Sequence, residues 1–332
     1  MINKYQIKNF TTQNGVSIDI ELGYTMQGNL NKSKTNAILV LTSYAATHVD
    51  AQDLFAKTEI LKQSDHCVVV INMFSNSVSS SPSNTPKPYN GNNFPLFTIF
   101  DNVAAQYKLI KEELGINKLN LVMGFSMGGL QAFEWGAQHP EMVESILPIC
   151  GAAKVSRHNW LFLEGIKSAL LSDSNFNGGD YKSQPKKGLD AFSTVYAGWA
   201  FSQDFFREEL FKEMGMEKIE DIIEFLKNYM KRRDANDLLG MLETWQAADI
   251  SNNYKYKGNF DKALQSIESK AIIMPCSTDL YFRVADSEYE VSQMPNAELR
   301  IINSKYGHVA GSGMDLIGKY EIDRAITDLL NN

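Results

Sequence analysis

The segment Gly124–Gly128 places one serine, Ser126, in the pattern Gly-x-Ser-x-Gly. Residues 118–123 before it are typical of a short buried strand, and residues 127–138 after it carry apolar side chains at helical spacing until His139. A chain that turns sharply from a strand into a helix has no room for a Cβ two positions before or after the turning residue. The sequence therefore predicts that Ser126 lies on a tight strand-to-helix turn, with its hydroxyl exposed as a nucleophile at a helix N-terminus.

Strand-like and helical segments alternate along most of the chain. Continuous apolar runs predict strands at residues 37–41, 67–71, 119–123, 145–149, 271–274 and 297–302. Helical periodicity predicts helices at residues 51–61, 101–113, 127–138, 284–291 and 316–330. Because buried strands that alternate with helices form mostly parallel sheets covered on both faces, we expect an α/β fold.

The alternation is interrupted in the middle of the chain. After Cys150 and Gly151, residues 155–264 show only helical periodicity and loops. We therefore predict a discontinuous core, residues 1–152 and 266–332, with an inserted helical lid at residues 153–265.

Two N-terminal segments also depart from the α/β pattern. Asn14 and Gly15 separate strand-like residues 5–12 and 16–24, which predicts a hairpin. Residues 74–95 form a connection rich in Ser, Asn and Pro that is longer than most loops. Such a segment is as consistent with a solvated surface loop as with a role in lining a site.

The composition argues against several functional classes. The chain has 332 residues, of which 44% are hydrophobic and 21% charged, as in an ordinary globular protein. Its net charge of −7 includes no long block of like charges, so we expect no nucleic-acid partner and no membrane surface. No apolar run approaches the roughly eighteen residues of a membrane span, and residues 1–10 lack the apolar region of a secretory signal. We therefore expect a cytoplasmic protein.

Three cysteines, Cys67, Cys150 and Cys276, lie in or at the end of apolar, strand-like runs. Their separation matches no metal-binding spacing, and none lies in the electropositive turn that activates a thiol. We expect reduced, buried thiols, and we expect neither a metal ion nor a cofactor.

A serine nucleophile requires a base to take its proton and an acid to orient that base. His308 is the best base candidate, because it follows the last predicted strand in a loop at the carboxyl edge of the sheet; His48, after an early strand, is a second histidine near that edge. Asp279 directly follows the predicted strand 271–274, a position that is also common for a helix N-cap. The order Ser126, Asp279, His308 is that of the catalytic triad in α/β hydrolases.

Acyl transfer also requires N–H donors that stabilise the oxyanion. The backbone N–H of Met127, directly after the nucleophile, is expected to supply one donor. The second is expected from the loop that follows residues 37–41, at Ser43 or Tyr44, and the sequence does not choose between them.

The stretch GFSMGGLQAFEWGAQHP at residues 124–140 resembles the homoserine transacetylase (homoserine O-acetyltransferase) family of α/β hydrolases. Further similar motifs follow the same order along the chain: Lys87-Pro88-Tyr89, Asn93-Phe94-Pro95, Asp234-Ala235-Asn236, Ser277-Thr278-Asp279 and Tyr306-Gly307-His308. The resemblance implies an α/β-hydrolase fold with a helical lid, a covalent acyl intermediate on Ser126, ping-pong transfer and a homodimer built through lid helices.

The lid departs from that family at one position. Homoserine transacetylases carry an arginine after a Thr-Tyr pair, which is expected to bind the carboxylate of the amino-acid acceptor. Here residues 194–199 read Thr-Val-Tyr-Ala-Gly-Trp, without arginine. Arg207, Arg232 and Arg233 are alternative cations, although each is also consistent with a solvated helix charge.

Family members that lack these acceptor features resemble esterases. We therefore expect a carboxylic ester hydrolase with a Ser-His-Asp triad that acts on small acyl esters. The alternative is an acyl-CoA-dependent O-acyltransferase, with acetyl-CoA as its co-substrate. Tyr196 and Trp199 in the lid are candidates for binding the substrate, and aromatic residues at helical spacing are equally consistent with lid core.

Overall fold

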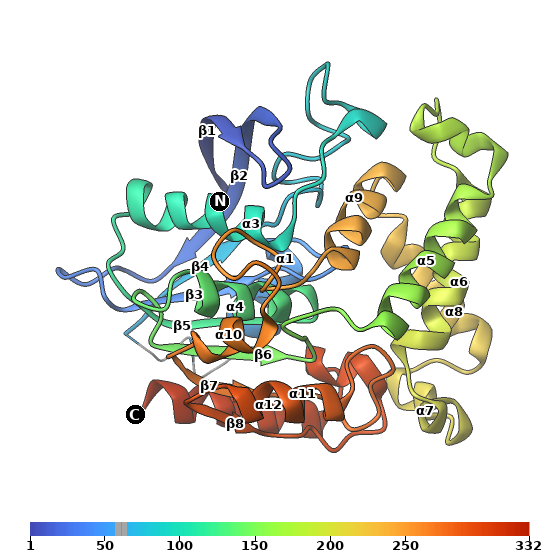
Figure 1. Cartoon of the computed structure of the whole chain (residues 1–332). Helices are drawn as coiled ribbons and strands as arrows, with labels where there is room; N and C mark the ends of the chain where they lie inside the picture. The colour runs from blue at the N-terminus through green and yellow to red at the C-terminus, as the bar shows by residue number, and fades with distance from the viewer. Residues whose placement is uncertain (57–60, 62–64, 332) are drawn as a thin grey trace.

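A mixed sheet of eight strands forms the centre of the molecule (Figure 1). The structure is a computed structural model that describes residues 1–56, 61 and 65–331. The strands are β1 (Asn3–Thr11), β2 (Ser17–Gln27), β3 (Ala37–Leu41), β4 (Cys67–Ile71), β5 (Leu119–Phe125), β6 (Ser145–Ile149), β7 (Lys270–Ile273) and β8 (Ala297–Leu299). Their order across the sheet is β1-β2-β4-β3-β5-β6-β7-β8. The N-terminal hairpin is antiparallel and β2 pairs antiparallel with β4, whereas β3 to β8 all run parallel.

Strand β3 shows why this sheet is buried on both faces. All five of its residues are buried. Ile38 and Val40 belong to one apolar cluster, and Ala37, Leu39 and Leu41 belong to the other. Because successive side chains of a strand point to opposite faces, a continuous apolar run supplies both cores at once.

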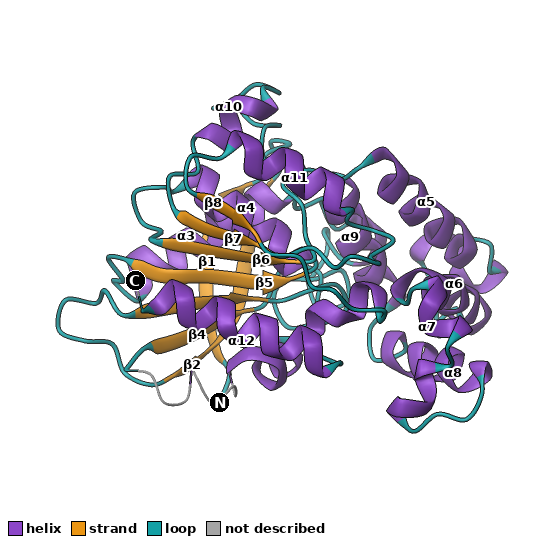
Figure 2. Ribbon diagram, turned by 90° about the horizontal axis from the view of Figure 1, so that it is seen from below, coloured by secondary structure: helices purple, strands orange, loops and turns teal. Residues whose placement is uncertain are grey.

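Helices cover both faces of the sheet, as Figure 2 shows. The helices of the described residues include α1 (His48–Ala51), α3 (Ile99–Lys108), α4 (Met127–Gln138), α5 (Arg157–Leu171), α6 (Lys186–Ala200), α7 (Gln203–Arg207), α8 (Ile219–Met230), α9 (Ala235–Gln246), α10 (Phe260–Gln265), α11 (Val284–Gln293) and α12 (Leu316–Leu330). The fold is the expected α/β architecture, with parallel strands and helical crossovers.

Several predicted elements have different bounds in the structure. The helix predicted at 51–61 consists of α1 followed by a π-helical turn at Gln52–Ala56, and residues 57–60 and 62–64 lie outside the described residues. The helix predicted at 101–113 begins at Ile99, because a capping box of Thr98 and Asp101 starts it there, and its last turn is π-helical.

The strand predicted at 297–302 ends at Leu299. Its pairing partner β7 leads into Pro275, which has no N–H to donate, so the ladder is interrupted. Beyond the interruption, Ile302 pairs with Cys276 in an isolated bridge.

Helices α5 to α9 gather beside the sheet and form a separate helical layer (Figures 1 and 2). Two segments connect this layer to the sheet, and they meet in an antiparallel bridge between Lys154 and Asp249, whose side chains form an ion pair at 2.7 Å. Helix α10, within the predicted lid, contacts α11, and its Ala263 and Leu264 belong to an apolar cluster of the sheet. The lid boundary at residue 265 stays a prediction.

The long connection at residues 74–95 is hydrogen-bonded to the lid. The carboxylate of Asp237 in α9 accepts hydrogen bonds of 2.6 Å from the hydroxyls of both Ser77 and Ser83. Burial raises the pKa of Asp237 to about 6. The connection is therefore an ordered loop that packs against the lid, as its polar composition allows.

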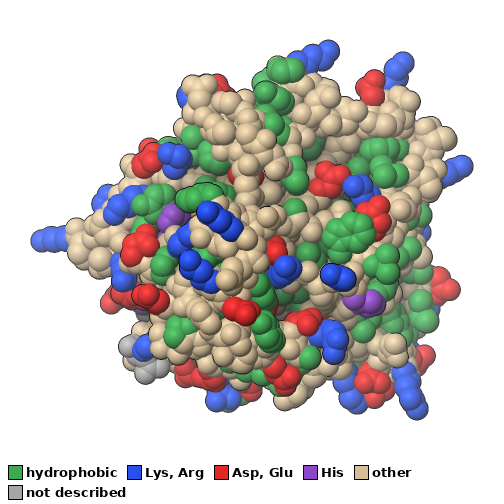
Figure 3. All heavy atoms as spheres, viewed as in Figure 1, with side chains coloured by type: hydrophobic (Ala, Val, Ile, Leu, Met, Phe, Trp, Pro, Cys, Tyr) green, Lys and Arg blue, Asp and Glu red, His purple; other side chains and the backbone are tan. Residues whose placement is uncertain are grey.

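No helix in the described residues combines the length and apolar character that are needed to cross a membrane. On the face that Figure 3 displays, acidic and basic side chains are interspersed. The cytoplasmic location stays a prediction.

Candidate active site

The turn at Ser126 has the geometry that its two glycines predict. Ser126 has φ 57° and ψ −120°, a strained conformation between β5 and α4. A Cβ on Gly124 would lie 2.5 Å from the backbone of Gly128, and a Cβ on Gly128 would lie 2.6 Å from the carbonyl oxygen of Leu41. Both positions therefore require glycine, and the predicted strand-to-helix turn is confirmed. Ser126 itself is buried, and its role as nucleophile stays a prediction.

His308 contacts both of the other predicted triad residues. Its Nε2 lies 2.9 Å from Ser126 Oγ, and its Nδ1 lies 2.7 Å from Asp279 Oδ2. All three residues are buried. Since an ionised carboxylate only accepts hydrogen bonds, Nδ1 carries the proton and Nε2 is free to accept the serine hydroxyl.

The loops that carry the acid and the histidine are held by their own hydrogen bonds. The second oxygen of Asp279 accepts the backbone N–H groups of Tyr281 at 2.7 Å and Phe282 at 3.1 Å. Gly307 has φ 71°, and a Cβ there would lie 2.6 Å from the backbone nitrogen of Ser202, so only glycine fits before the histidine. The predicted N-cap alternative for Asp279 is not seen, because α11 begins after Arg283.

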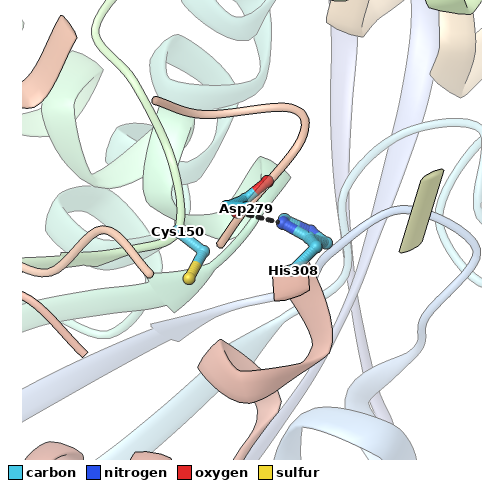
Figure 4. Close-up of side chains that lie close together, drawn as sticks. All are labelled: Cys150, Asp279 and His308. Carbon is cyan, nitrogen blue, oxygen red and sulfur yellow. Dashed lines mark hydrogen bonds and ion pairs between the residues drawn. The ribbon is translucent and has the colours of Figure 1, made fainter. Parts of the chain in front are cut away.

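Cys150 lies close to Asp279 and His308, as Figure 4 shows. The Sγ of Cys150, a carboxylate oxygen of Asp279 and a ring nitrogen of His308 all lie within 4.8 Å of one another. Burial, followed by the charge of Asp279, raises the pKa of the Cys150 thiol well above its ordinary value. Metal binding requires a thiolate, and Asp279 and His308 already bond each other, so this trio is poorly suited to hold a metal ion. The sequence contained no signal that placed Cys150 here.

A cavity of about 260 Å³ opens above Ser126 and His308. Residues of the core and of the lid line it together: Ser43, Tyr44, Asp50, Asp53, Leu54, Phe125, Ser126, Tyr196, Ala200, Phe201, Phe225, Leu226, Tyr229, Met230, His308, Val309, Ser312 and Met314. The lining is mostly apolar, and its carboxylates, Asp50 and Asp53, come from the segment after β3. A small uncharged group of a ligand suits this apolar space better than a charged group does.

The two aromatic candidates of the lid have different positions. Tyr196 lines the cavity, and burial raises its pKa well above the ordinary value. Trp199 does not line it, because its ring packs 4.8 Å from Phe162 and 5.1 Å from His158. It contributes instead to a separate surface groove between α5 and α6.

Ser43 and Tyr44 reach the elbow because β3 pairs with β5. Leu41 is aligned with Gly124 in that pairing, so the loop after β3 begins beside the turn at Ser126. Both residues line the cavity, and the Tyr44 hydroxyl donates to the carbonyl of Leu238 at 3.0 Å. The Tyr44 hydroxyl is therefore engaged with the lid, and the choice between the two residues stays open. Met127 is the first residue of α4, where a helix has N–H groups without helical acceptors.

Three other residues, His48, His139 and Arg207, do not line the cavity. The backbone N–H of His48 donates to Asn72 at the start of α1, and His139 stacks on Tyr107 at 4.0 Å. Burial lowers the pKa of His139 to about 4. Arg207 is exposed on α7.

Asp50 was missed from the sequence, although Thr47 and Asp50 have the spacing of a capping box at the start of α1. It lines the cavity and contacts Arg232 and Arg233.

An elbow serine, an acid after β7 and a histidine after β8 on a mostly parallel sheet define the class of α/β hydrolases. A model of the alpha/beta hydrolase fold family matches residues 37–311, and the chain belongs to this family. The similar proteins of this family that are described below are enzymes, and this chain is an enzyme of the same class.

The similar proteins fall into two groups, esterases and homoserine O-acetyltransferases. The chain is 35% identical over 315 residues to the ethyl acetate hydrolase of Pseudomonas veronii, an alignment that covers 94% of this chain and 90% of that protein. The crystal structure of the acetyl esterase MekB is similar with a TM-score of 0.97 and 33% identity, over 100% of this chain and 97% of that one. A homoserine O-acetyltransferase of Chlorobium chlorochromatii is 26% identical, over 97% of this chain and 93% of that protein. The resemblance to homoserine acetyltransferases is confirmed, and the esterases are more similar.

Proposed function

We propose that this chain is a carboxylic ester hydrolase that acts on small acyl esters. The observation that carries the proposal is the chain of hydrogen bonds from Asp279 through His308 to Ser126 at the base of an apolar cavity. The relatives that are named as esterases support the same choice of reaction. No cofactor takes part in the proposed reaction.

In the proposed mechanism, Ser126 Oγ attacks the ester carbonyl carbon while His308 Nε2 takes the hydroxyl proton. Asp279 holds the imidazole in the productive tautomer and stabilises the imidazolium. The backbone N–H of Met127 and that of Ser43 or Tyr44 bind the oxyanion, each contributing roughly 3 kcal/mol to lowering the barrier.

The alcohol then leaves with the proton from His308, and an acyl-serine remains. A water molecule attacks this acyl-serine while His308 takes its proton. The bond between the acyl carbon and Ser126 Oγ then breaks as His308 returns the proton to Oγ, and the carboxylic acid is released.

The second candidate is an O-acyltransferase that uses acetyl-CoA, which the similarity to homoserine O-acetyltransferases favours. Selection of homoserine requires a cation for its carboxylate. Among the described residues that line the cavity there is no lysine or arginine, which favours water as the acceptor.

Product analysis separates the two candidates. The protein is incubated with p-nitrophenyl acetate and with ethyl acetate, both without CoA, and separately with acetyl-CoA and homoserine. We expect acetate from both esters and no O-acetylhomoserine. Stoichiometric O-acetylhomoserine would favour the transferase instead.

Ser126→Ala should lower kcat for ester hydrolysis by about 10⁴-fold or more, because the nucleophile is lost. Ser172→Ala is a matched control, since this exposed serine lies at the end of α5, and we expect it to retain activity. Comparable activity in the two variants would contradict a covalent role for Ser126.

We also propose a homodimer through the lid helices. Apolar side chains are exposed along α5 and α6, among them Trp160, Leu161 and Val195, next to the groove that contains Trp199. Apolar residues that gather on one surface typically mark a protein interface.

A further inference from the structure

Asp50 connects the core to the lid beside the cavity. Its carboxylate lines the cavity, and 20% of its side chain is exposed. One oxygen accepts the backbone N–H of Thr47 at 2.8 Å and thereby caps α1, directly after the loop that contains Ser43 and Tyr44. The other oxygen accepts a hydrogen bond from Arg232 of the lid at 3.1 Å.

Two neighbouring arginines of the lid face this carboxylate. Arg232 keeps 43% of its side chain exposed and stacks 4.2 Å from the ring of Tyr229, which lines the cavity. Arg233 is only 10% exposed, and its Nη2 lies 3.6 Å from Asp50. Its Nε has no hydrogen-bond partner among the described residues, so this guanidinium retains unused capacity to bind an anion.

The charge balance on this side of the cavity depends on Asp50. Two guanidinium groups beside an apolar cavity would attract a carboxylate, because arginine binds carboxylates through two parallel hydrogen bonds. Asp50 already occupies this position with a carboxylate of its own. A second carboxylate, from a substrate, would have to displace it or lie beside it at the cost of charge repulsion.

We infer that Asp50 is a specificity-determining residue that restricts this site to uncharged esters, since it repels carboxylate-bearing substrates and occupies the two arginines that would bind them. The inference rests on the proposed ester hydrolysis and names its substrate class. It also explains how the lid retains arginines beside the cavity without recruiting an amino-acid acceptor.

Two matched pairs of esters test the inference, one for each side of the ester bond. Ethyl butanoate is compared with monoethyl succinate, and propyl acetate is compared with 3-acetoxypropanoate. The measured quantity is the ratio of kcat/KM for the charged ester to kcat/KM for its neutral partner. We expect Asp50→Asn to raise this ratio at least tenfold in one pair or both.

Two further variants identify the cause. Asp53→Asn removes the same charge from the same cavity but leaves Asp50 and its arginines in place, so we expect a smaller rise. Adding Arg232→Gln and Arg233→Gln to Asp50→Asn should abolish most of the gain. An unchanged ratio in Asp50→Asn, or an equal rise in Asp53→Asn, would overturn the inference.

A binding measurement separates this inference from the proposed reaction. Asn at position 50 retains an oxygen that can accept the Thr47 N–H, and circular dichroism checks that the variant folds. Succinate should raise the thermal unfolding midpoint of Asp50→Asn more than that of the wild type. Failure to hydrolyse any neutral ester would contradict the proposed function alone, whereas equal responses to succinate would contradict the role of Asp50.

Discussion

The carboxylate of Asp279 uses both of its oxygens. One bonds His308 Nδ1, and the other accepts two backbone N–H groups of its own loop. Hydrogen bonds to backbone groups fix the carboxylate more firmly than a surface ion pair would, because the whole group is buried and cannot turn towards solvent. The Asp279 loop therefore fixes the orientation of the His308 imidazole.

Replacing Asp279 by Asn should disable the imidazole with little change in shape. The amide NH₂ would donate to Nδ1 and thus favour the tautomer whose Nε2 carries the proton, which cannot accept the Ser126 hydroxyl. We expect kcat for p-nitrophenyl acetate to fall by about 10³- to 10⁴-fold with a small change in KM. Asp286→Asn, in the following helix α11, is the matched control. A loss below tenfold in Asp279→Asn would contradict the proposed role.

At the scale of elements, helix α11 supports the connection between the sheet and the lid. The buried Glu290 of α11 accepts the backbone N–H of Ala153 at 2.7 Å, next to the bridge between Lys154 and Asp249. Its second oxygen has no partner among the described residues. Burial raises the pKa of Glu290 from 4.5 to about 8, so this carboxyl group holds its proton at neutral pH.

This shift predicts a loss of stability with rising pH. Between pH 4.5 and 8 the folded state binds the Glu290 proton and the unfolded state does not, so the free energy of unfolding decreases as pH rises. Glu290→Gln stays neutral and should remove about 3 kcal/mol of the decrease between pH 5.5 and 8.5. Urea unfolding at the two pH values measures the difference. Glu288→Gln, exposed on the same helix, should follow the wild type; the same behaviour in Glu290→Gln would contradict the prediction.

At the scale of the whole molecule, the lid has two different surfaces. Its inner side supplies Tyr196, Leu226 and other apolar residues to the cavity above Ser126. Its outer side exposes apolar residues of α5 and α6. An interface on the outer side would hold the lid helices in place and thereby preserve the shape of the cavity.

Leu161→Asp should therefore separate the proposed homodimer. Leu161 is 64% exposed on α5, and a carboxylate there would be buried without a partner in an apolar interface. Light scattering after gel filtration should give the mass of a dimer for the wild type and of a monomer for the variant. Leu316→Asp, at a leucine that is 86% exposed on α12, should leave the dimer intact. A monomeric wild type would contradict the proposal.

The local sequence predicted those elements whose causes are local. Met127–Gln138 and Ser145–Ile149 have the predicted bounds, because apolar spacing and a terminating His139-Pro140 need no distant partner. The end of β8 was not predicted, because it depends on Pro275, which follows the neighbouring strand β7. The position of Trp199 likewise depends on Phe162 and His158 of another helix.

The sequence by itself determined the strained turn at Ser126, since two glycines and a strand-helix pattern within about twenty residues specify this turn. The sequence also indicated Asp279 and His308, because each follows a predicted strand and the three residues have the order Ser, Asp, His. Only the tertiary structure decided which groups surround these residues. Cys150 close to Asp279, and Asp50 between the core and the arginines of the lid, come from segments far apart in the chain. Such neighbours arise from packing across the sheet and the lid, and no local pattern of residues encodes them.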